Sequence, residues 1–145
     1  MTGNVAPEAV AAVRAGALDG VEVEVLAASE ISAVDGSIDV LFIGPASPYS
    51  AAVELFQTWP GRVVPGGSLF VHGAFALPPL TAGLLRTIGG SRGWRYFDRE
   101  GALAEYVRSD LSHGERVLDA IAQAAQLPWF ARSLVRRRAA RFRSA

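Results

Sequence analysis

Residues 37–71 constrain the fold more than any other stretch, because their pattern predicts a strand, a helix, a turn and a second strand. Residues 38–43 are apolar almost without interruption, as a parallel strand covered on both faces requires. Apolar residues then recur at helical spacing over residues 49–59. Pro65-Gly66-Gly67 supplies a turn before a second apolar strand at residues 69–71. This order predicts one right-handed βαβ unit.

The rest of the chain continues the alternation of helix and strand. The next predicted elements are a helix from Pro7, a strand over residues 21–26, a helix from Pro78 and an aromatic strand over residues 94–97. Residues 103–107 are expected to pair with that strand as an antiparallel hairpin, with residues 98–101 as the turn. The alternation predicts an open α/β sheet.

The end of the chain is predicted to be helical. An amphipathic helix precedes Pro128, and its apolar residues are Val117, Leu118, Ile121, Ala124 and Ala125. Residues 129–145 keep a helical period, but arginine occurs nearly all the way around the axis.

Ligands bind open α/β sheets beyond the carboxyl ends of the parallel strands. The segments expected to form a site are therefore residues 27–30, 44–49 and 72–74.

The charges balance over the whole chain but not along it. Fourteen arginines and fourteen acidic residues cancel, so the net charge points to neither nucleic acid nor a membrane as partner. Residues 1–131 hold all fourteen acids and eight arginines, a net charge of −6. Residues 132–145, called the tail below, carry a net charge of +6. The six arginines of the tail are Arg132, Arg136, Arg137, Arg138, Arg141 and Arg143.

Three interpretations of this arginine-rich tail stay open. It is a solvated tail, an amphipathic segment on an anionic membrane surface, or a segment that binds nucleic acid or an acidic partner protein. The apolar contacts with a membrane would be Trp129, Phe130, Leu134 and Phe142. We expect the tail to contribute little to the fold, because burying several guanidinium groups costs several kcal/mol each unless all are paired.

Composition excludes several classes of site. The chain has no cysteine, which excludes disulfides, thiolate nucleophiles and cysteine-ligated metals. No apolar run approaches the roughly 20 residues that a membrane-spanning helix needs, and no basic segment followed by an apolar core opens the sequence. We expect a cytoplasmic protein.

The run IDVLFIGPASPYSAAVELFQTWPGRVVPGGSLFVHG, residues 38–73, resembles class I S-adenosylmethionine (SAM)-dependent methyltransferases. The similar region runs from the fourth strand through the PGG turn to the fifth, in the branch with an Asp-Gly-Asp-His-Ser-Tyr motif. The resemblance implies a Rossmann-like methyltransferase sheet that lacks its first strand and glycine loop. It divides the chain into a partial methyltransferase-like α/β domain, residues 1–108, and a C-terminal helix and arginine-rich tail, residues 109–145.

The resemblance also implies a site. The cofactor would be SAM, the catalytic residue His72, and the cofactor-binding residues Asn4, Ser29, Gly44, Ser47 and Tyr49. Asn4 replaces the family's acid, and residues 44–47 replace its Asp-Gly-Asp-His. Almost no oxygen ligands remain for a divalent ion, so no metal site is expected. For the same reasons we expect this chain alone to bind SAM weakly or not at all.

Each candidate also has a structural interpretation. His72 is either a general base at a strand end or a half-buried histidine bonded to backbone. Tyr49 either stacks on an adenine or packs at the start of its helix, and His113 is interpreted as a solvated residue near a helix start.

Gly89-Gly90-Ser91-Arg92-Gly93 matches the G-x-S-x-G pattern of serine hydrolases, but a nucleophile elbow needs a strand before the serine and a helix after it. Here the predicted order is the reverse.

Two hypotheses about function follow. The first is a SAM-dependent methyltransferase or methyltransferase-like protein acting on a small molecule. The alternative is a non-catalytic interaction protein on a degenerate methyltransferase fold, acting through self-association or its arginine-rich tail. Absence of the first strand would leave apolar faces bare, so we expect a homo-oligomer.

Overall fold

The computed structural model describes residues 36–46 and 48–143, with side chains of the last helix described through Arg136. Residues 37–145 form one compact unit. The helix predicted from Pro7 and the strand predicted over residues 21–26 lie outside the described residues. The absence of a first strand and glycine loop, which the resemblance implies, stays a prediction.

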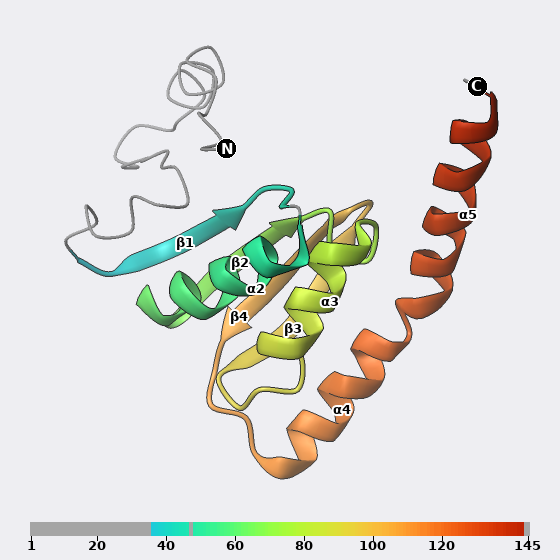
Figure 1. Ribbon diagram of the computed structural model, residues 1–145. Helices are drawn as coiled ribbons and strands as arrows, with labels where there is room; N and C mark the ends of the chain where they lie inside the picture. The colour runs from blue at the N-terminus through green and yellow to red at the C-terminus, as the bar shows by residue number, and fades with distance from the viewer. Residues whose placement is uncertain (1–35, 47, 144–145) are drawn as a thin grey trace. The chain divides into compact units, whose positions relative to one another are not determined.

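Four strands form one mixed sheet in the order β1-β2-β4-β3 (Figure 1). They are β1 (Ile38–Ile43), β2 (Val63–His72), β3 (Trp94–Glu100) and β4 (Leu103–Arg108). β1 and β2 are parallel, whereas β4 is antiparallel to both of its neighbours. The predicted α/β class, parallel βαβ unit and antiparallel hairpin are therefore confirmed, and the hairpin places its second strand against β2.

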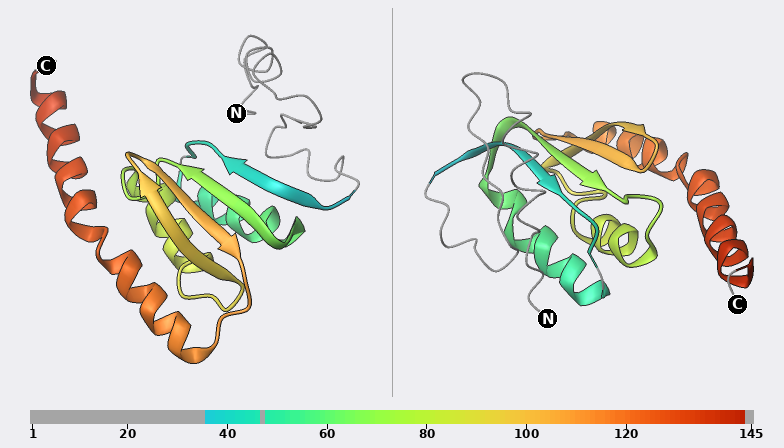
Figure 2. Two further views of the ribbon diagram at one scale, coloured as in Figure 1. Left: turned by 180° about the vertical axis from the view of Figure 1, so that it is seen from behind. Right: turned by 90° about the horizontal axis from the view of Figure 1, so that it is seen from above.

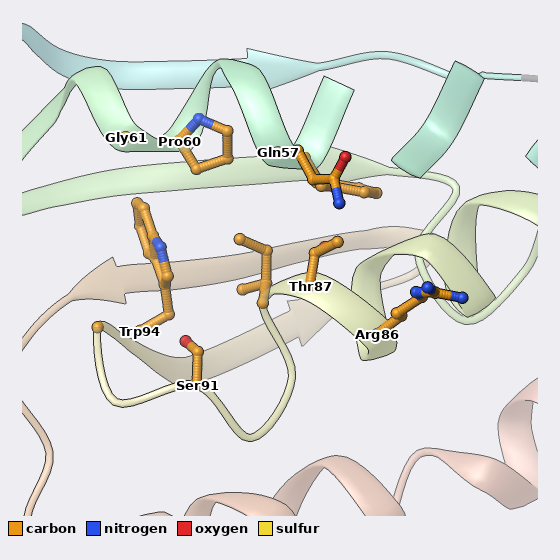
Figure 3. Close-up of a pocket in the computed structure, with 10 residues that line it drawn as sticks. Gln57, Pro60, Gly61, Arg86, Thr87, Ser91 and Trp94 are labelled. Atoms are coloured by element: carbon orange, nitrogen blue, oxygen red, sulfur yellow. The ribbon is translucent and has the colours of Figure 1, made fainter. Parts of the chain in front are cut away.

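Helices α2 (Tyr49–Thr58) and α3 (Pro78–Thr87) lie on the same face of this sheet (Figure 2). They approach closely because small residues meet: a Cβ added to Gly83 would lie 3.1 Å from the Cβ of Ala52. Near their last turns, with the short 3-10 helix η2 (Pro60–Arg62), they border a groove (Figure 3). Proline and glycine signals locate both helices correctly, since Pro78 begins α3 and Pro60 follows α2.

The core lies between the sheet and these two helices. β2 contributes Leu69 and Val71, which pair with Tyr106 and Ala104 of β4, and all four side chains are fully buried. The helices add apolar side chains to the same cluster, which are Ala52, Phe56, Leu80 and Leu84. Because strand residues alternate between faces, one face of the sheet holds this core and the other carries the remaining side chains.

The opposite face of the sheet is open within the described part of the chain. On β1, Val40 is 61% exposed and Phe42 is 60% exposed, and Phe97 of β3 is also exposed. Seen from behind, the strands lie in front of α2 and α3 (Figure 2). The prediction that residues 38–43 are covered on both faces is therefore wrong for the residues that the structure describes.

The PGG segment is a bulge inside β2 and does not form a turn before it. Ile38 pairs with Val63 and Val40 pairs with Ser68, so a short stretch of β1 faces a longer stretch of β2. Gly66 takes a φ of +84°, and a Cβ on Gly67 would lie 2.7 Å from the carbonyl oxygen of Asp39. The glycines are needed here for conformation and for close strand contact.

The hairpin turn is also shorter than predicted. β3 continues through Glu100, and the chain reverses at Gly101, which has a φ of +57°, and Ala102. Asp98 pairs with Glu105 inside the ladder, and a shift of register between Tyr96 and Asp98 absorbs Phe97. The predicted turn over residues 98–101 is therefore wrong, because polar side chains on the open face resemble turn residues in the sequence.

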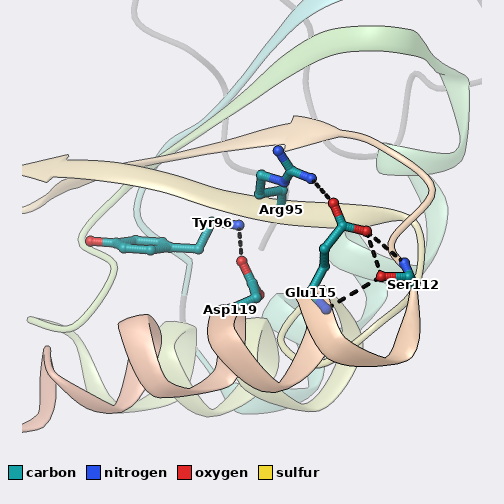
Figure 4. A network of polar contacts seen from close by, with 5 residues as sticks. All are labelled: Arg95, Tyr96, Ser112, Glu115 and Asp119. Atoms are coloured by element: carbon teal, nitrogen blue, oxygen red, sulfur yellow. Dashed lines mark hydrogen bonds and ion pairs between the residues drawn. The ribbon is translucent and has the colours of Figure 1, made fainter.

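Helix α4 (His113–Ala124) packs on the sheet by its polar side. An amphipathic helix usually buries its apolar stripe, yet Leu118 is 68% exposed and Ile121 is 61% exposed, whereas Asp119 is only 7% exposed. Asp119 Oδ1 accepts a 2.6 Å hydrogen bond from the backbone N–H of Tyr96 (Figure 4). The prediction of a helix is confirmed, and its buried side is the polar one.

Gln123 extends this buried network toward the core. Its Nε2 donates to Asp119 Oδ2 over 2.6 Å, and its Oε1 accepts from the hydroxyl of Tyr106 over 3.2 Å. Burial raises the pKa of Tyr106, so this hydroxyl remains a proton donor. Each polar group that α4 brings to the sheet thus has a partner.

Helix α5 (Leu127–Arg143) begins just after α4 ends, so Pro128 marks the break as predicted. Its first turn is attached to the sheet unit: Trp129 and Phe130 pack against the core, and the Arg99 guanidinium lies 4.7 Å from the Trp129 ring centroid. Arg99 Nε also donates to Gln126 over 2.7 Å.

Replacing Asp119 by alanine is expected to lower the free energy of unfolding by about 2–4 kcal/mol, because it leaves buried donors on Tyr96 and Gln123 without partners. Urea unfolding measures the change. Asp110→Ala is the matched control, since Asp110 is exposed and its replacement should change stability by less than about 0.5 kcal/mol. Equal losses in the two variants would contradict the structural role of Asp119.

Candidate functional site

The carboxyl ends of the two parallel strands form the candidate site. Ile43 pairs with Val71, so Gly44 and His72 follow at the same level on β1 and β2. The loops that lead into α2 and α3 both begin at this edge. Open α/β sheets bind ligands at such edges, which makes this the place to look for chemistry.

The loop after β2 is held firmly by its backbone. Gly73 has a φ of +96°, its N–H donates to the carbonyl of Ala102 over 2.8 Å, and its own carbonyl accepts from Leu77 over 2.8 Å. A Cβ on Gly73 would lie 2.6 Å from Leu77 Cδ1. Only glycine therefore fits this position without rearrangement.

Phe75 in the same loop adopts a conformation that bulky residues rarely take. Its φ is +53°, and its fully buried ring packs edge-to-face against Tyr96 with centroids 6.2 Å apart. Backbone strain of this kind persists only where the surroundings enforce it and often occurs at functional sites. The buried ring thus fixes the loop that follows His72.

His72 itself is exposed. It pairs with Leu103 of β4, and since Val71 points into the core, the imidazole lies on the open face of the sheet. Within the described residues its side chain makes no hydrogen bond, so it differs from the half-buried, backbone-bonded histidine considered above. The imidazole of His72 is therefore exposed next to a loop that is fixed by its backbone.

Tyr49, the first residue of α2, is partly exposed and contacts α3. Its hydroxyl accepts a long hydrogen bond, 3.4 Å, from Arg86 Nη1. Gly44 is partly buried, and a Cβ there would meet nothing within 4 Å. Sequence patterns did not single out Arg86, because it is one arginine among many on a predicted helix; only the packing of α2 on α3 shows its partner.

Three of the six predicted site residues, Gly44, Tyr49 and His72, follow or end the two parallel strands. The other three, Asn4, Ser29 and Ser47, lie outside the described residues. The site as described therefore supplies an imidazole, a phenol and backbone groups.

The described residues at this edge do not fit SAM by themselves. A ribose is commonly held by a carboxylate, but the described residues of the loops after β1 and β2, which are 44–46, 48 and 73–77, contain no acid. Sheet pairing places Glu105 opposite Phe70 and Glu100 opposite Leu103, on β4 and β3, and Glu105 accepts a 3.0 Å hydrogen bond from Ser68 Oγ. Among the described residues, no three His, Asp or Glu side chains group to hold a metal ion.

The groove of about 450 Å³ between α2 and α3 is a separate feature (Figure 3). Its lining includes Arg86, Ser91 and Trp94, and the Ser91 hydroxyl oxygen is buried with no hydrogen-bond partner in the described structure. Helix α3 precedes Ser91 and β3 follows it, which confirms that the G-x-S-x-G match is not a nucleophile elbow.

Comparison with known protein families and with curated proteins finds no match to this chain. Among the helices that the structure describes, none combines the length and the apolar character needed to cross a membrane.

Replacing Gly73 by alanine is expected to destabilise the protein by more than about 1 kcal/mol, because the new Cβ meets Leu77 and the positive φ is strained. Thermal unfolding measures this loss. Gly44→Ala in the neighbouring loop is the control, since it has neither a positive φ nor a close contact. A Gly73→Ala variant as stable as Gly44→Ala would show that the loop is not rigid.

Proposed function

We propose that this protein is a SAM-dependent methyltransferase or a methyltransferase-like protein that acts on a small molecule in the cytoplasm. One observation carries the proposal. The residues that resemble the family form a parallel βαβ unit, in which Gly44 follows β1, Tyr49 begins the connecting helix and His72 ends β2. Fold-level likeness alone does not establish activity, so the proposal depends on the carboxyl edge of this unit.

In this proposal His72 is the general base. Its imidazole is exposed at the end of β2, and the loop that begins at Gly73 keeps the strand end in one position. A methyl acceptor with a hydroxyl or amine would lose its proton to the imidazole. Tyr49, on the first turn of α2, would line the same edge.

The described residues do not complete a cofactor site, so no step is assigned to SAM. SAM would supply the methyl group, while this chain's described residues offer an adenine-stacking phenol at most. We therefore expect weak binding, with a dissociation constant above about 10 μM, equivalent to a binding free energy weaker than about −7 kcal/mol.

A titration monitored by protein NMR tests both the proposed methyltransferase site and the expected weak binding of SAM. With SAM or S-adenosylhomocysteine, we expect weak, saturable shifts confined to residues 44–49 and 72–75. His72→Gln should alter these chemical shifts, and in an activity assay it should abolish transfer of the methyl group. His113→Gln, at the exposed start of α4, should do neither. Binding tighter than about 10 μM would contradict the incomplete site, and shifts located elsewhere or absent would contradict the methyltransferase proposal.

A second candidate is a non-catalytic interaction protein that self-associates through the open sheet face. Exposed Val40, Phe42 and Phe97 favour it, because large apolar side chains on two strands of one bare face are a common feature of interfaces. β1 is also the last strand on its side of the sheet among the described residues, which leaves its edge without a strand partner there.

Light scattering with size-exclusion chromatography tests this candidate. We expect a dimer or larger species at about 100 μM, and Phe42→Ser should weaken it at least tenfold by removing buried apolar area. Leu85→Ser is the matched control, because Leu85 is an exposed apolar residue of α3, the helix that covers the other face of the sheet. A wild-type protein that is monomeric at this concentration would rule the candidate out.

A further inference from the structure

Helix α4 and the start of α5 expose several large apolar side chains. Between Val117 and Ala131 the only charged residue is Asp119, and Asp119 is buried. The exposed large apolar side chains, called the α4 face below, are Val117, Leu118, Ile121 and Leu127. A surface helix with no charge on its outward side needs an apolar neighbour.

Polar contacts along α4 fix this orientation. At its start, Ser112 and Glu115 form a capping box, and Glu115 pairs with Arg95 over 2.6 Å (Figure 4). The next residue, Arg116, donates from Nη2 to the carbonyl of Gly90 over 2.8 Å. With Asp119 bonded to the backbone of β3, the helix cannot turn its apolar side inward without breaking contacts along its length.

Positive charge follows directly on the apolar surface. No acidic residue occurs after Asp119, and α5 carries the six arginines of the tail. Arg132 and Arg136 are exposed, and Val135 between them is exposed as well. The C-terminal helices therefore combine an uncharged apolar face with a cationic segment.

We infer that the α4 face and the arginines of α5 bind an anionic lipid surface, with α4 at the boundary between head groups and acyl chains. Peripheral binding of this kind grows with buried apolar area and with attraction between cationic side chains and anionic head groups. In this arrangement α4 and α5 would lie along the lipid surface. The inference concerns location and does not depend on the proposed methyl transfer.

A lipid surface supplies an apolar layer and negative charge side by side, which matches both features. Nucleic acid would attract the arginines through its phosphates, but it offers no apolar layer to cover the charge-free apolar face. A second copy would have to cover that face with an apolar surface of its own while its residues 1–131, which carry a net charge of −6, attract the six arginines of the tail. The experiment below separates this occupant from a lipid surface. Anionic lipid complements both the apolar and the cationic part.

Sedimentation with vesicles of phosphatidylcholine and phosphatidylserine, in a ratio of about 7:3, tests the inference on the full chain. We expect binding that pure phosphatidylcholine does not support and that falls as salt rises to about 0.5 M. Leu118→Ser with Ile121→Ser should weaken binding at least tenfold. Arg132→Gln with Arg136→Gln should weaken it about tenfold or more and reduce its salt dependence.

Leu85→Ser on α3 serves as the control and should bind like the wild type. Every variant changes an exposed residue, so circular dichroism should show unchanged melting. The inference is overturned if the wild type does not sediment with anionic vesicles, or if the Leu118/Ile121 variant still does. Concentration-dependent dimers that this variant abolishes, without vesicle binding, would assign the face to a second copy. A salt-sensitive complex with duplex DNA in place of vesicles would assign the tail to nucleic acid.

Discussion

The buried hydrogen bond between Asp119 and the backbone of Tyr96 determines how the C-terminal third of the structure is arranged. Tyr96 lies on β3, which is the last strand on one side of the sheet among the described residues, so its outer edge has no further described strand to bond. The carboxyl of Asp119 supplies the missing acceptor, and Gln123 carries the network to Tyr106 in the core. Since these groups share one side of α4, the apolar side has to face outward.

The opposite end of the sheet depends on a different constraint, the packing of the loop after β2. Gly73 fits against Leu77, and Phe75 keeps a left-handed conformation because its ring is enclosed next to Tyr96. Tyr96 therefore takes part in both arrangements: its ring supports the loop, and its N–H holds α4. Through this one residue, the candidate site and α4 share their support.

Elements with strong local signals were predictable from the sequence. The βαβ unit, α3 and the hairpin follow from periodicity and from proline and glycine positions, which act through the local backbone. The orientation of α4 was not predictable, because Asp119 and Gln123, four residues apart, have the same pattern as a solvated helix face. Their buried role depends on Tyr96 and Tyr106, which only the fold brings near.

The same limit applies to the bulge in β2 and to the site. Pro65-Gly66-Gly67 signals a change of backbone direction, but only the pairing with β1 shows that this change occurs within a strand. For the site, chain order alone indicated the carboxyl edge that holds Gly44 and His72. It did not reveal the hydrogen bond from Arg86 to Tyr49, which joins α3 to α2 through two residues that are 37 positions apart in sequence.

The sheet order also separates the two surfaces for which a function is proposed. The candidate site lies where β1 and β2 end, whereas α4 packs on β3, beyond β4 in the sheet order. A lipid surface that contacts the outward side of α4 meets the side chains pointing away from the sheet. His72 lies on β2, two strands away from β3, on the face of the sheet opposite the core. The proposed contacts with a membrane and with a small molecule at the carboxyl edge therefore involve different side chains, so the two proposals are compatible.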